Sequence, residues 1–253
     1  MAHFNVKDLQ KSIETLQDIV RCAVCLETVR GEIVQCVNGH LLCSGCKTSL
    51  RDCPTCRQRF STAKPSRTIT QVIEALPTRC KHQNCEVYVT SGGDDHEKYC
   101  GFQITDCKLC EWEGCAKDIL EHLKEQHPST KIRTGEMKDM YIKNFEYEKE
   151  MESNNAYFVD GQFFWYTISN DPVSKLFIKT CHAVPIGKCD DKFYLKVMLN
   201  SKETEFVSKI ILNLDPDVDD DENSIIIPWK TVPNYIDSDG DFLYNHQIAK
   251  EVI

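Results

Sequence analysis

Hydrophobic residues near the start of the chain recur at intervals of three and four positions. Between residues 6 and 20 the repeat consists of Val6, Leu9, Ile13, Leu16 and Val20. This spacing places the apolar side chains on one face of an α-helix, so we predict an amphipathic helix over residues 6–20. We favour the interpretation that the helix packs against the module that follows it. A dimerisation helix is the alternative.

Three later segments also carry helical signals. The run ITQVIEAL (69–76) predicts two helical turns, with Thr68 as a candidate N-cap and Pro77 as the end. The polar residues 61–68 before it have the composition of a linker. A second helix is predicted over 117–126. A third, short helix is predicted within 136–152, where helical spacing joins Met137, Met140, Tyr141 and Phe145.

From Tyr157 onward the hydrophobic period changes from helical to two residues. YFVDGQFFWYTI has a strand, an Asp-Gly turn and a second strand, the signature of a tight hairpin. Alternation continues in KFYLKVML, and EFVSKIILNL and SIIIPW have the composition of further strands. Short strands separated by turns predict an antiparallel β-sandwich over residues 133–253.

The cysteines gather in the other half of the chain. Of 15 Cys, 13 lie before residue 116. The first residues have no apolar core of the kind that a signal peptide needs, and no run is long enough to span a membrane. We therefore expect a location in the cytosol, or also the nucleus, where thiols stay reduced and closely spaced cysteines bind metal. The odd number of cysteines also argues against a disulfide framework.

The first cysteine cluster has the spacing of two zinc sites. It reads Cys-x2-Cys-x10-Cys-x3-His-x2-Cys-x2-Cys-x6-Cys-x2-Cys, with the ligands Cys22, Cys25, Cys36, His40, Cys43, Cys46, Cys53 and Cys56. Four such ligands close one tetrahedral zinc site, so eight make two. Thirty-five residues are too few for an adequate hydrophobic core, and zinc would hold this fold together with about 10 kcal/mol or more.

A second cluster supplies two more sets of four ligands. The third set is Cys80, Cys85, His96 and Cys100, and the fourth is Cys107, Cys110, His122 and His127. Cys115 competes with Cys110, which we prefer for its two-residue spacing. A finger of this last type can bind DNA, but its helix ILEHLKEQ has two Glu and one Lys, and after residue 135 the chain has 12 basic and 22 acidic residues. We therefore expect a structural finger and no nucleic-acid partner.

The spacing of the first cluster closely resembles that of RING domains, and the order of all the clusters resembles the seven in absentia homologue (Siah/Sina) family of RING-type E3 ubiquitin ligases. The stretches that carry this resemblance are VQCVNGHLLCSGCKTSLRDCPTCR, TRCKHQNCEV, EKYC and CEWEGCAKDILEHLKEQH, with FYLKVMLNSKETEFVSKIILNL and IIIPWKTVP in the second half.

The resemblance implies an α+β multidomain chain with four zinc ions. It would comprise an N-terminal helix (1–20), a RING domain (21–60), a linker with a short helix (61–78), tandem Siah-type zinc fingers (79–132) and a substrate-binding, TRAF-C-like β-sandwich (133–253). The RING would be cross-braced. One zinc would bind Cys22, Cys25, Cys43 and Cys46, and the other would bind Cys36, His40, Cys53 and Cys56.

The resemblance also implies a mechanism and partners. A ubiquitin-charged E2 conjugating enzyme would dock on Val24, Leu50 and Pro54. Arg57 would bridge ubiquitin and the E2 through its planar fork of donors. The RING would hold the conjugate ready for attack by a lysine of a substrate bound to the sandwich, without a covalent intermediate on this chain, and the substrate would go to proteasomal degradation. No membrane partner is expected.

Several alternatives stay open from the sequence. The chain could be a zinc-stabilised interaction adaptor without ligase activity. A homodimer is a family expectation. The chain ends at Ile253, earlier than family members usually do, which suggests that a terminal strand is missing. The acidic run DPDVDDDEN (215–223) is expected to lengthen a hairpin loop, as a solvated turn.

Overall fold

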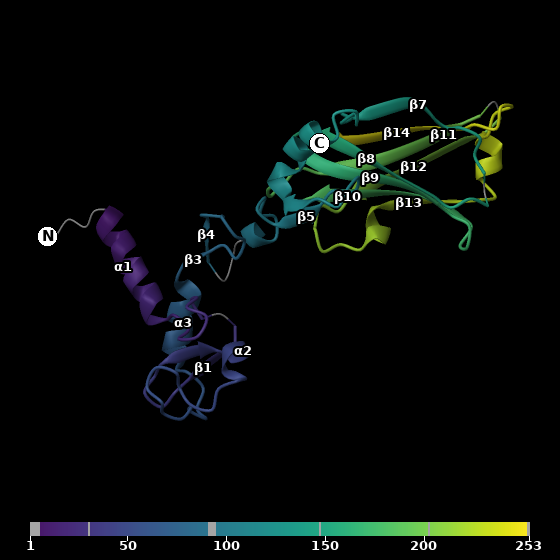
Figure 1. Cartoon of the computed structure of the whole chain (residues 1–253). Helices are drawn as coiled ribbons and strands as arrows, with labels where there is room; N and C mark the ends of the chain where they lie inside the picture. The colour runs from purple at the N-terminus through teal and green to yellow at the C-terminus, as the bar shows by residue number, and fades with distance from the viewer. Residues whose placement is uncertain (1–5, 30, 91–94, 147, 202, 252–253) are drawn as a thin grey trace. The chain divides into compact units, whose positions relative to one another are not determined.

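The computed structural model describes residues 6–29, 31–90, 95–146, 148–201 and 203–251, without the side chains of Val6, Asp139 and Asp220. Residues 1–5 of the predicted N-terminal segment lie outside these ranges. The chain divides into two compact units, Met1–Glu97 and Lys98–Ile253 (Figure 1). None of the helices in the described residues is long and apolar enough to cross a membrane.

The first unit begins with α1 (Val6–Ile19), which confirms the predicted amphipathic helix. Its side chains Leu9, Leu16 and Ile19 are 54%, 43% and 65% exposed. Gln17 is half-buried, and its side-chain amide donates to the Pro77 carbonyl. Of the predicted stripe, Leu9 and Leu16 are exposed within the described residues, and Ile13 is half-buried. Val20 is buried in the core of the following module, so the helix packs against that module through its C-terminal end, as the favoured interpretation predicted in part.

A small core follows α1. It forms around the antiparallel strands β1 (Ile33–Gln35) and β2 (Leu41–Cys43), the short helix α2 (Ser44–Lys47) and the helix α3 (Arg67–Ala75). The buried residues of this core are Val20, Cys22, Val29, Leu41, Leu42, Ile73 and Leu76. Because Ile73 and Leu76 belong to it, the helix that the sequence placed in a linker packs with the cysteine-rich module. The unit closes with β3 (Thr78–Arg79), β4 (Tyr88–Val89) and the 3₁₀ turn η1 (Asp95–Glu97).

The N-cap of α3 differs from the prediction. Ser66 has an extended backbone, and its Oγ accepts a hydrogen bond from the Ile69 N–H at 3.3 Å. Thr68 already lies inside the helix, so it cannot cap it. The true cap is Ser66, two residues earlier than the sequence suggested.

The second unit contains the predicted β-sandwich, made of two four-stranded antiparallel sheets in the orders β13-β10-β9-β8 and β12-β11-β14-β7. Side chains from both sheets form one core. In β11 the predicted alternation is confirmed, with Phe193, Leu195, Val197 and Leu199 buried. The strands are β7 (Glu136–Ile142), β8 (Met151–Val159), β9 (Gln162–Asp171), β10 (Leu176–Val184), β11 (Phe193–Asn200), β12 (Glu205–Leu212), β13 (Ser224–Pro228) and β14 (Phe242–Lys250).

The predicted hairpin around Asp160 and Gly161 is confirmed. Val159 and Gln162 are paired, and the two turn residues have φ of 47° and 83°. Both central residues are thus left-handed, as in a type I′ turn, which matches the right-handed twist of the flanking strands.

The predicted short helix in 136–152 is wrong, because residues 136–142 form strand β7 at the edge of a sheet. Its pairing with β14 contains an irregularity. Tyr244 and His246, two residues apart, pair with Met140 and Met137, three residues apart. The extra residue lets both methionines pack against the sandwich core. A β-bulge therefore produced the three-residue spacing that resembled a helix.

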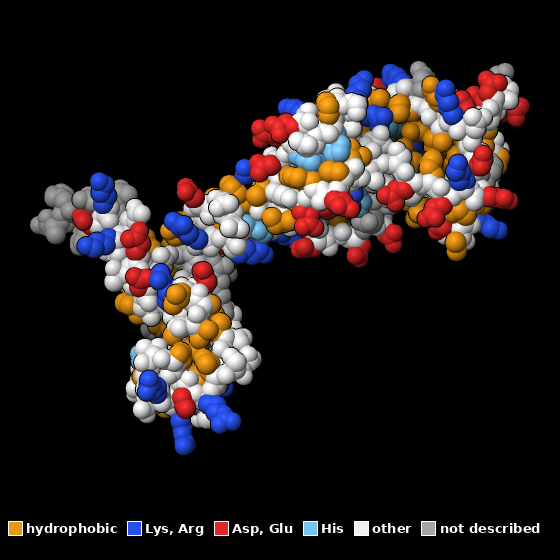
Figure 2. All heavy atoms as spheres, viewed as in Figure 1, with side chains coloured by type: hydrophobic (Ala, Val, Ile, Leu, Met, Phe, Trp, Pro, Cys, Tyr) orange, Lys and Arg blue, Asp and Glu red, His pale blue; other side chains and the backbone are white. Residues whose placement is uncertain are grey.

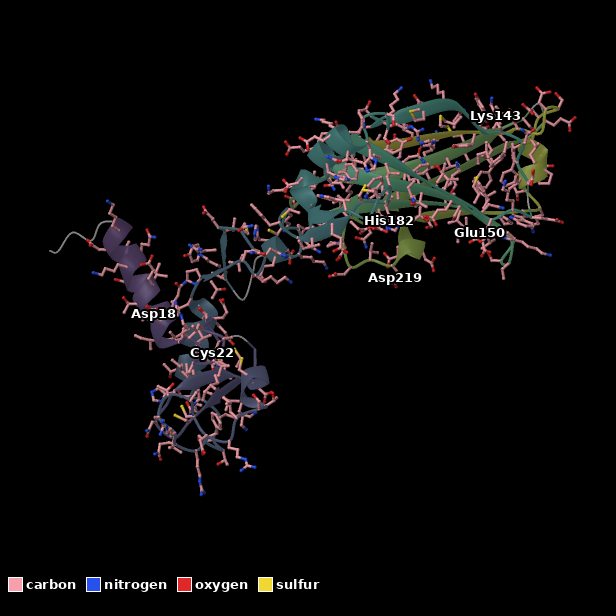
Figure 3. All side chains as sticks on the ribbon, viewed as in Figure 1. Asp18, Cys22, Lys143, Glu150, His182 and Asp219 are labelled. Atoms are coloured by element: carbon pink, nitrogen blue, oxygen red, sulfur yellow. The ribbon has the colours of Figure 1, made fainter. Side chains whose placement is uncertain are left out.

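The acidic run 215–223 was expected to lie in a hairpin loop, and this prediction is wrong. It connects β12 of one sheet to β13 of the other, and it ends in the 3₁₀ turn η3 (Asp220–Asn223). Figure 3 labels Asp219 in this connection. Lys98 Nζ lies 2.5 Å from Asp215 and 3.3 Å from Asp217. The hydrogen bond from Lys98 holds the pKa of Asp215 below its usual range.

A second core lies on the outer face of the β8–β9–β10 sheet. The finger segment comprises β5 (Ile104–Asp106), β6 (Glu113–Cys115), the 3₁₀ turn η2 (Ala116–Asp118) and α4 (Ile119–Gln126). Ile119 and Leu123 of α4 pack with Phe163 and Trp165 of β9. Both faces of β9 are therefore buried, which explains its continuous apolar run FFWY. A further 3₁₀ turn, η4 (Val232–Tyr235), lies before β14. Figure 2 shows acidic side chains spread over the visible face of this unit.

Candidate functional site

Four groups of Cys and His side chains lie close enough to hold metal ions. Within each group the ligand atoms all lie within 4.8 Å of one another. The groups are the four ligand sets expected from the sequence: Cys22, Cys25, Cys43 and Cys46; Cys36, His40, Cys53 and Cys56; Cys80, Cys85, His96 and Cys100; and Cys107, Cys110, His122 and His127. Cys115 belongs to none of them, so the fourth set takes Cys110.

Two Cys-x2-Cys knuckles of the RING have the same local geometry. One presents Cys22 and Cys25 to the first ligand set, and the other presents Cys53 and Cys56 to the second. In one, the Leu26 N–H donates to the Cys22 carbonyl at 3.0 Å. In the other, the Arg57 N–H donates to the Cys53 carbonyl at 2.8 Å. Leu26 and Arg57 have φ of 63° and 58°, a left-handed conformation that turns the chain sharply after the second thiol. Figure 3 places the labelled Cys22 just beyond the end of α1.

The β1–β2 hairpin and α2 supply the remaining RING ligands. Cys36 and His40 lie in the hairpin loop, where the Cys36 N–H donates to the His40 carbonyl at 3.0 Å. Cys43 ends β2 and is the N-cap of α2, and its backbone N–H donates to Cys22 Sγ at 3.4 Å. The two sets alternate along the chain, so each zinc would tie together loops that the other also holds.

The distances between donor atoms fit tetrahedral zinc. Zn–S and Zn–N bonds of about 2.3 and about 2.0 Å place two sulfurs about 3.8 Å apart, and a sulfur and a nitrogen about 3.5 Å apart. Cys36 Sγ lies 3.7 Å from Cys56 Sγ and 3.4 Å from His40 Nδ1. In the fourth set, Cys110 Sγ lies 3.4 Å from His122 Nε2 and 3.3 Å from His127 Nε2. The donor types and spacings therefore both suit zinc.

The thiol pKa values also fit a bound cation. Burial raises the pKa of Cys22, but backbone N–H donors, first that of Cys43, outweigh it and lower the pKa to about 6. Burial, followed by the sulfur atoms of Cys25 and Cys22, raises the pKa of Cys46 to about 12. A positive ion held between Cys22 and Cys46 would favour the thiolate form of both.

The third and fourth sets use the same local devices. In the third, the Cys80 N–H donates to the Val87 carbonyl at 2.9 Å, and Cys85 Sγ lies 3.3 Å from His96 Nε2. In the fourth, the Cys107 N–H donates to the Trp112 carbonyl at 2.9 Å. His122 lies on α4, and His127 is the C-cap residue of that helix. Burial, and then the nearby His127, lowers the pKa of His122, which favours the neutral form that binds metal.

The residues predicted to contact an E2 lie in and beside the RING knuckles. Val24 is 44% exposed, and Pro54 and Arg57 are also exposed. Leu50 is half-buried and packs against the RING core. The left-handed backbone at Arg57 directs the chain away from the second zinc set immediately after its last ligand. The contact roles of these four residues stay predictions.

Trp112 and Gly114 were not singled out from the sequence. The Trp112 ring stacks on the ligand His122 with ring centroids 4.3 Å apart. An aromatic residue followed closely by a glycine, directly after a Cys-x2-Cys knuckle, was the available signal. It carries no spacing rule of its own, because the stacking depends on how the hairpin folds over α4.

Comparison with known proteins shows which proteins this chain is similar to. Residues 22–56 match the family model of the RING finger of E3 ubiquitin-protein ligase sina/sinah. The chain is 31% identical over 125 residues to E3 ubiquitin-protein ligase siah-1 of Caenorhabditis briggsae, covering 47% of this chain and 29% of the relative. It is 28% identical over 135 residues to E3 ubiquitin-protein ligase siah2 of Xenopus laevis, covering 51% and 43%.

A third relative, E3 ubiquitin-protein ligase SIAH2 of Homo sapiens, is 29% identical over 128 residues, covering 48% of this chain and 40% of the relative. The chain thus spans less than half the length of each of these curated relatives. The RING match, the four ligand sets and these likenesses agree with one another. Residues 22–56 are thus similar to the RING finger of sina/sinah proteins, and about half of the chain is similar to proteins named siah.

Proposed function

We propose that this chain is a RING-type E3 ubiquitin ligase, which binds a ubiquitin-charged E2 enzyme and speeds ubiquitin transfer to lysines of bound substrates. The observation that carries the proposal is the cross-braced pair of ligand sets in residues 22–56, the same residues that match the sina-type RING finger. Relatives named E3 ubiquitin-protein ligases support it.

Zinc, when bound, would hold the two knuckles in place and supply no reacting group. The apolar side chains Val24, Leu50 and Pro54 would receive the E2. Arg57 would donate to carbonyl groups of both ubiquitin and the E2, and so restrict the conjugate to geometries in which the thioester can be attacked. No residue of this chain needs to form a bond to ubiquitin.

Substrate binding is proposed for the sandwich. An open groove of about 670 Å³ lies at one end of it, between the β11–β12 turn and η4. Its lining mixes polar side chains such as Asn200 and Thr204 with Tyr235 and Leu243.

We also propose that ubiquitinated substrates go to proteasomal degradation, that the protein works in the cytosol and nucleus, and that two copies associate. Sedimentation of the full chain tests this association.

The left-handed backbone at residue 57 decides which variant tests the ligase proposal. Arg57 already holds a left-handed backbone, and Asn is the residue other than glycine that adopts this conformation most readily, so Arg57→Asn removes the guanidinium without adding backbone strain. We expect Arg57→Asn to lower the rate of ubiquitin ladder formation by about tenfold or more, since tenfold corresponds to about 1.4 kcal/mol, close to one hydrogen bond from a charged donor. Val24→Ala should weaken E2 binding.

The measurement is an in vitro assay with the zinc-loaded full chain and a panel of E2 enzymes. Arg59→Asn is the matched control, because Arg59 is an exposed arginine of the same module outside the proposed contacts. Ladders that persist in Arg57→Asn and Val24→Ala would contradict the proposed docking surface. Absence of ladders with every E2 would favour the adaptor without ligase activity.

A further inference from the structure

The fourth ligand set has an aromatic neighbour that the ligand pattern does not include. The rings of Trp112 and His122 are stacked, with centroids 4.3 Å apart and planes inclined by 15°. His122 is buried, and the ring of the second histidine ligand, His127, lies edge-on to it at 5.2 Å. The indole thus covers one face of the His122 imidazole.

Gly114 leaves the space in which this indole lies. A Cβ atom at position 114 would lie 2.2 Å from Trp112 Cζ2 and 2.8 Å from Cε2. These separations are far below any van der Waals contact, and the atoms belong to a rigid ring already stacked on His122. Gly114 has no left-handed φ, so the requirement for glycine is one of space alone.

The backbone of Trp112 also takes part in the site. Its carbonyl accepts the Cys107 N–H at 2.9 Å and closes the knuckle that presents Cys107 and Cys110. The same residue therefore shapes the cysteine half of the ligand set through its backbone and contacts the histidine half through its side chain.

We propose that Trp112, seated on Gly114, is a positioning residue for the zinc ligand His122 and shields the fourth set against loss of its metal. A metal-bound histidine needs a fixed ring orientation, commonly supplied by a hydrogen bond to its second nitrogen. Stacking against a flat indole restricts the same ring rotation. With a metal bound, it would also limit the access of water and competing ligands to the covered face of the His122 ring.

The fourth set can be observed separately from the others. Within the described residues, it is the set with two cysteines and two histidines, whereas the first has four cysteines and the second and third each have three cysteines and one histidine. When the full chain is loaded with ¹¹³Cd, the cadmium in this set should therefore give a resonance at a chemical shift of its own, because the shift depends on the number of sulfur and nitrogen ligands. Timed addition of a chelator then measures metal loss from each set.

We expect Trp112→Ala and Gly114→Ala to speed metal loss from the fourth set by about 10-fold or more, the usual effect of removing a residue that orients a ligand. The other three resonances should persist. The double variant should be no faster than either single variant, because both remove the same contact. Trp112→Phe, which keeps a stacking ring, should restore most of the slow loss. Glu113→Ala is the matched control, exposed on the same strand.

Unchanged metal loss in both single variants would overturn the proposal, as would equal acceleration at all four sets. If Trp112→Ala does not fold, Gly114→Ala and Trp112→Phe decide. A well-folded Trp112→Phe that loses metal as fast as Gly114→Ala would show that the indole serves packing only. None of these readouts depends on ubiquitin transfer, so they stand apart from the ligase proposal.

Discussion

Lys179 places its amine inside the β-sandwich. The side chain is fully buried on β10, and its Nζ has no hydrogen-bond partner among the described residues. Nζ lies 3.2 Å from the centroid of the Tyr244 ring, with the rings of Tyr166 and Phe177 at 5.7 and 5.4 Å. Aromatic faces attract a cation, but they replace only part of its lost hydration. Burial therefore lowers the pKa of Lys179 well below its ordinary value.

The charged groups around Lys179 do not favour its protonation. Burial, and then the nearby positive charges of Lys179 and Arg133, lowers the pKa of His246 to about 2. The phenols of Tyr157 and Tyr244 have pKa values raised by burial, and they stay neutral. No partner carboxylate is within reach to form an ion pair with Nζ in the described structure.

We predict that Lys179→Met raises the free energy of unfolding by about 1–3 kcal/mol, since a flexible apolar chain fits without the desolvation cost. In the wild type the folded pKa is depressed, so the unfolded state binds the extra proton below about pH 10.5 and stability falls as pH falls. Denaturant unfolding of zinc-loaded protein between pH 7 and 9.5 should show this slope in the wild type and a flatter one in Lys179→Met. Equal slopes would contradict the prediction.

At the scale of elements, what the sequence predicted depended on how local the determining interactions are. Most ligands lie in short knuckles closed by nearby backbone hydrogen bonds, so spacing located the individual ligands. The cross-braced grouping of the first eight was implied by the resemblance to RING proteins. Strands such as β11 bury one face, so the alternation of apolar and polar residues was enough to predict them as strands. Strand β7 was mistaken for a helix because its bulge against β14 is a property of two strands about 100 residues apart.

Two other predictions from the sequence were wrong for similar reasons. Ser66 and Thr68 are both acceptable N-caps by residue type, and the choice depends on where α3 begins packing through Ile73 into the RING core. The connection 215–223 was expected within a hairpin because β12 and β13 are consecutive in sequence. β12 pairs with its sequence neighbour β11, whereas β13 pairs with the distant strand β10, and this long-range pairing places β13 in the other sheet.

The β8–β9 turn offers a test of one element in isolation. Gly161 has φ of 83°, and a Cβ added there would meet no atom within 4 Å. We predict that Gly161→Ala lowers the free energy of unfolding by about 1 kcal/mol, entirely from the left-handed backbone. Asp160→Asn is the matched control, because Asn tolerates the φ of 47° at its position. Chemical denaturation measures both, and equal stability of the two variants would argue against a strained turn.

At the scale of the whole molecule, the second zinc finger does not fold as a domain separate from the sandwich, because the two share a hydrophobic core. Ile119 and Leu123 of α4 share a core with Phe163, Trp165 and Val184 of the sandwich. The Arg133 N–H donates to the Ala156 carbonyl, and the Phe158 N–H donates to the Arg133 carbonyl, both at 2.9 Å, which ties the exit from the finger to the edge strand β8. Metal binding at the fourth set should therefore stabilise the sandwich as well as the finger.

This coupling predicts an effect of metal at a distance from the ligands. Cys110→Ser should weaken the fourth set, loosen α4 and expose the apolar side chains of β9 that it covers, so amide hydrogen exchange in β8 and β9 should accelerate. Leu123→Ala should have the same effect without replacing a ligand side chain, and should cost about 2–4 kcal/mol of stability. Cys25→Ser, in the other compact unit, is the control and should leave exchange in β8 and β9 unchanged. Identical exchange in the wild type and in Cys110→Ser would mean that the shared core holds its shape without zinc.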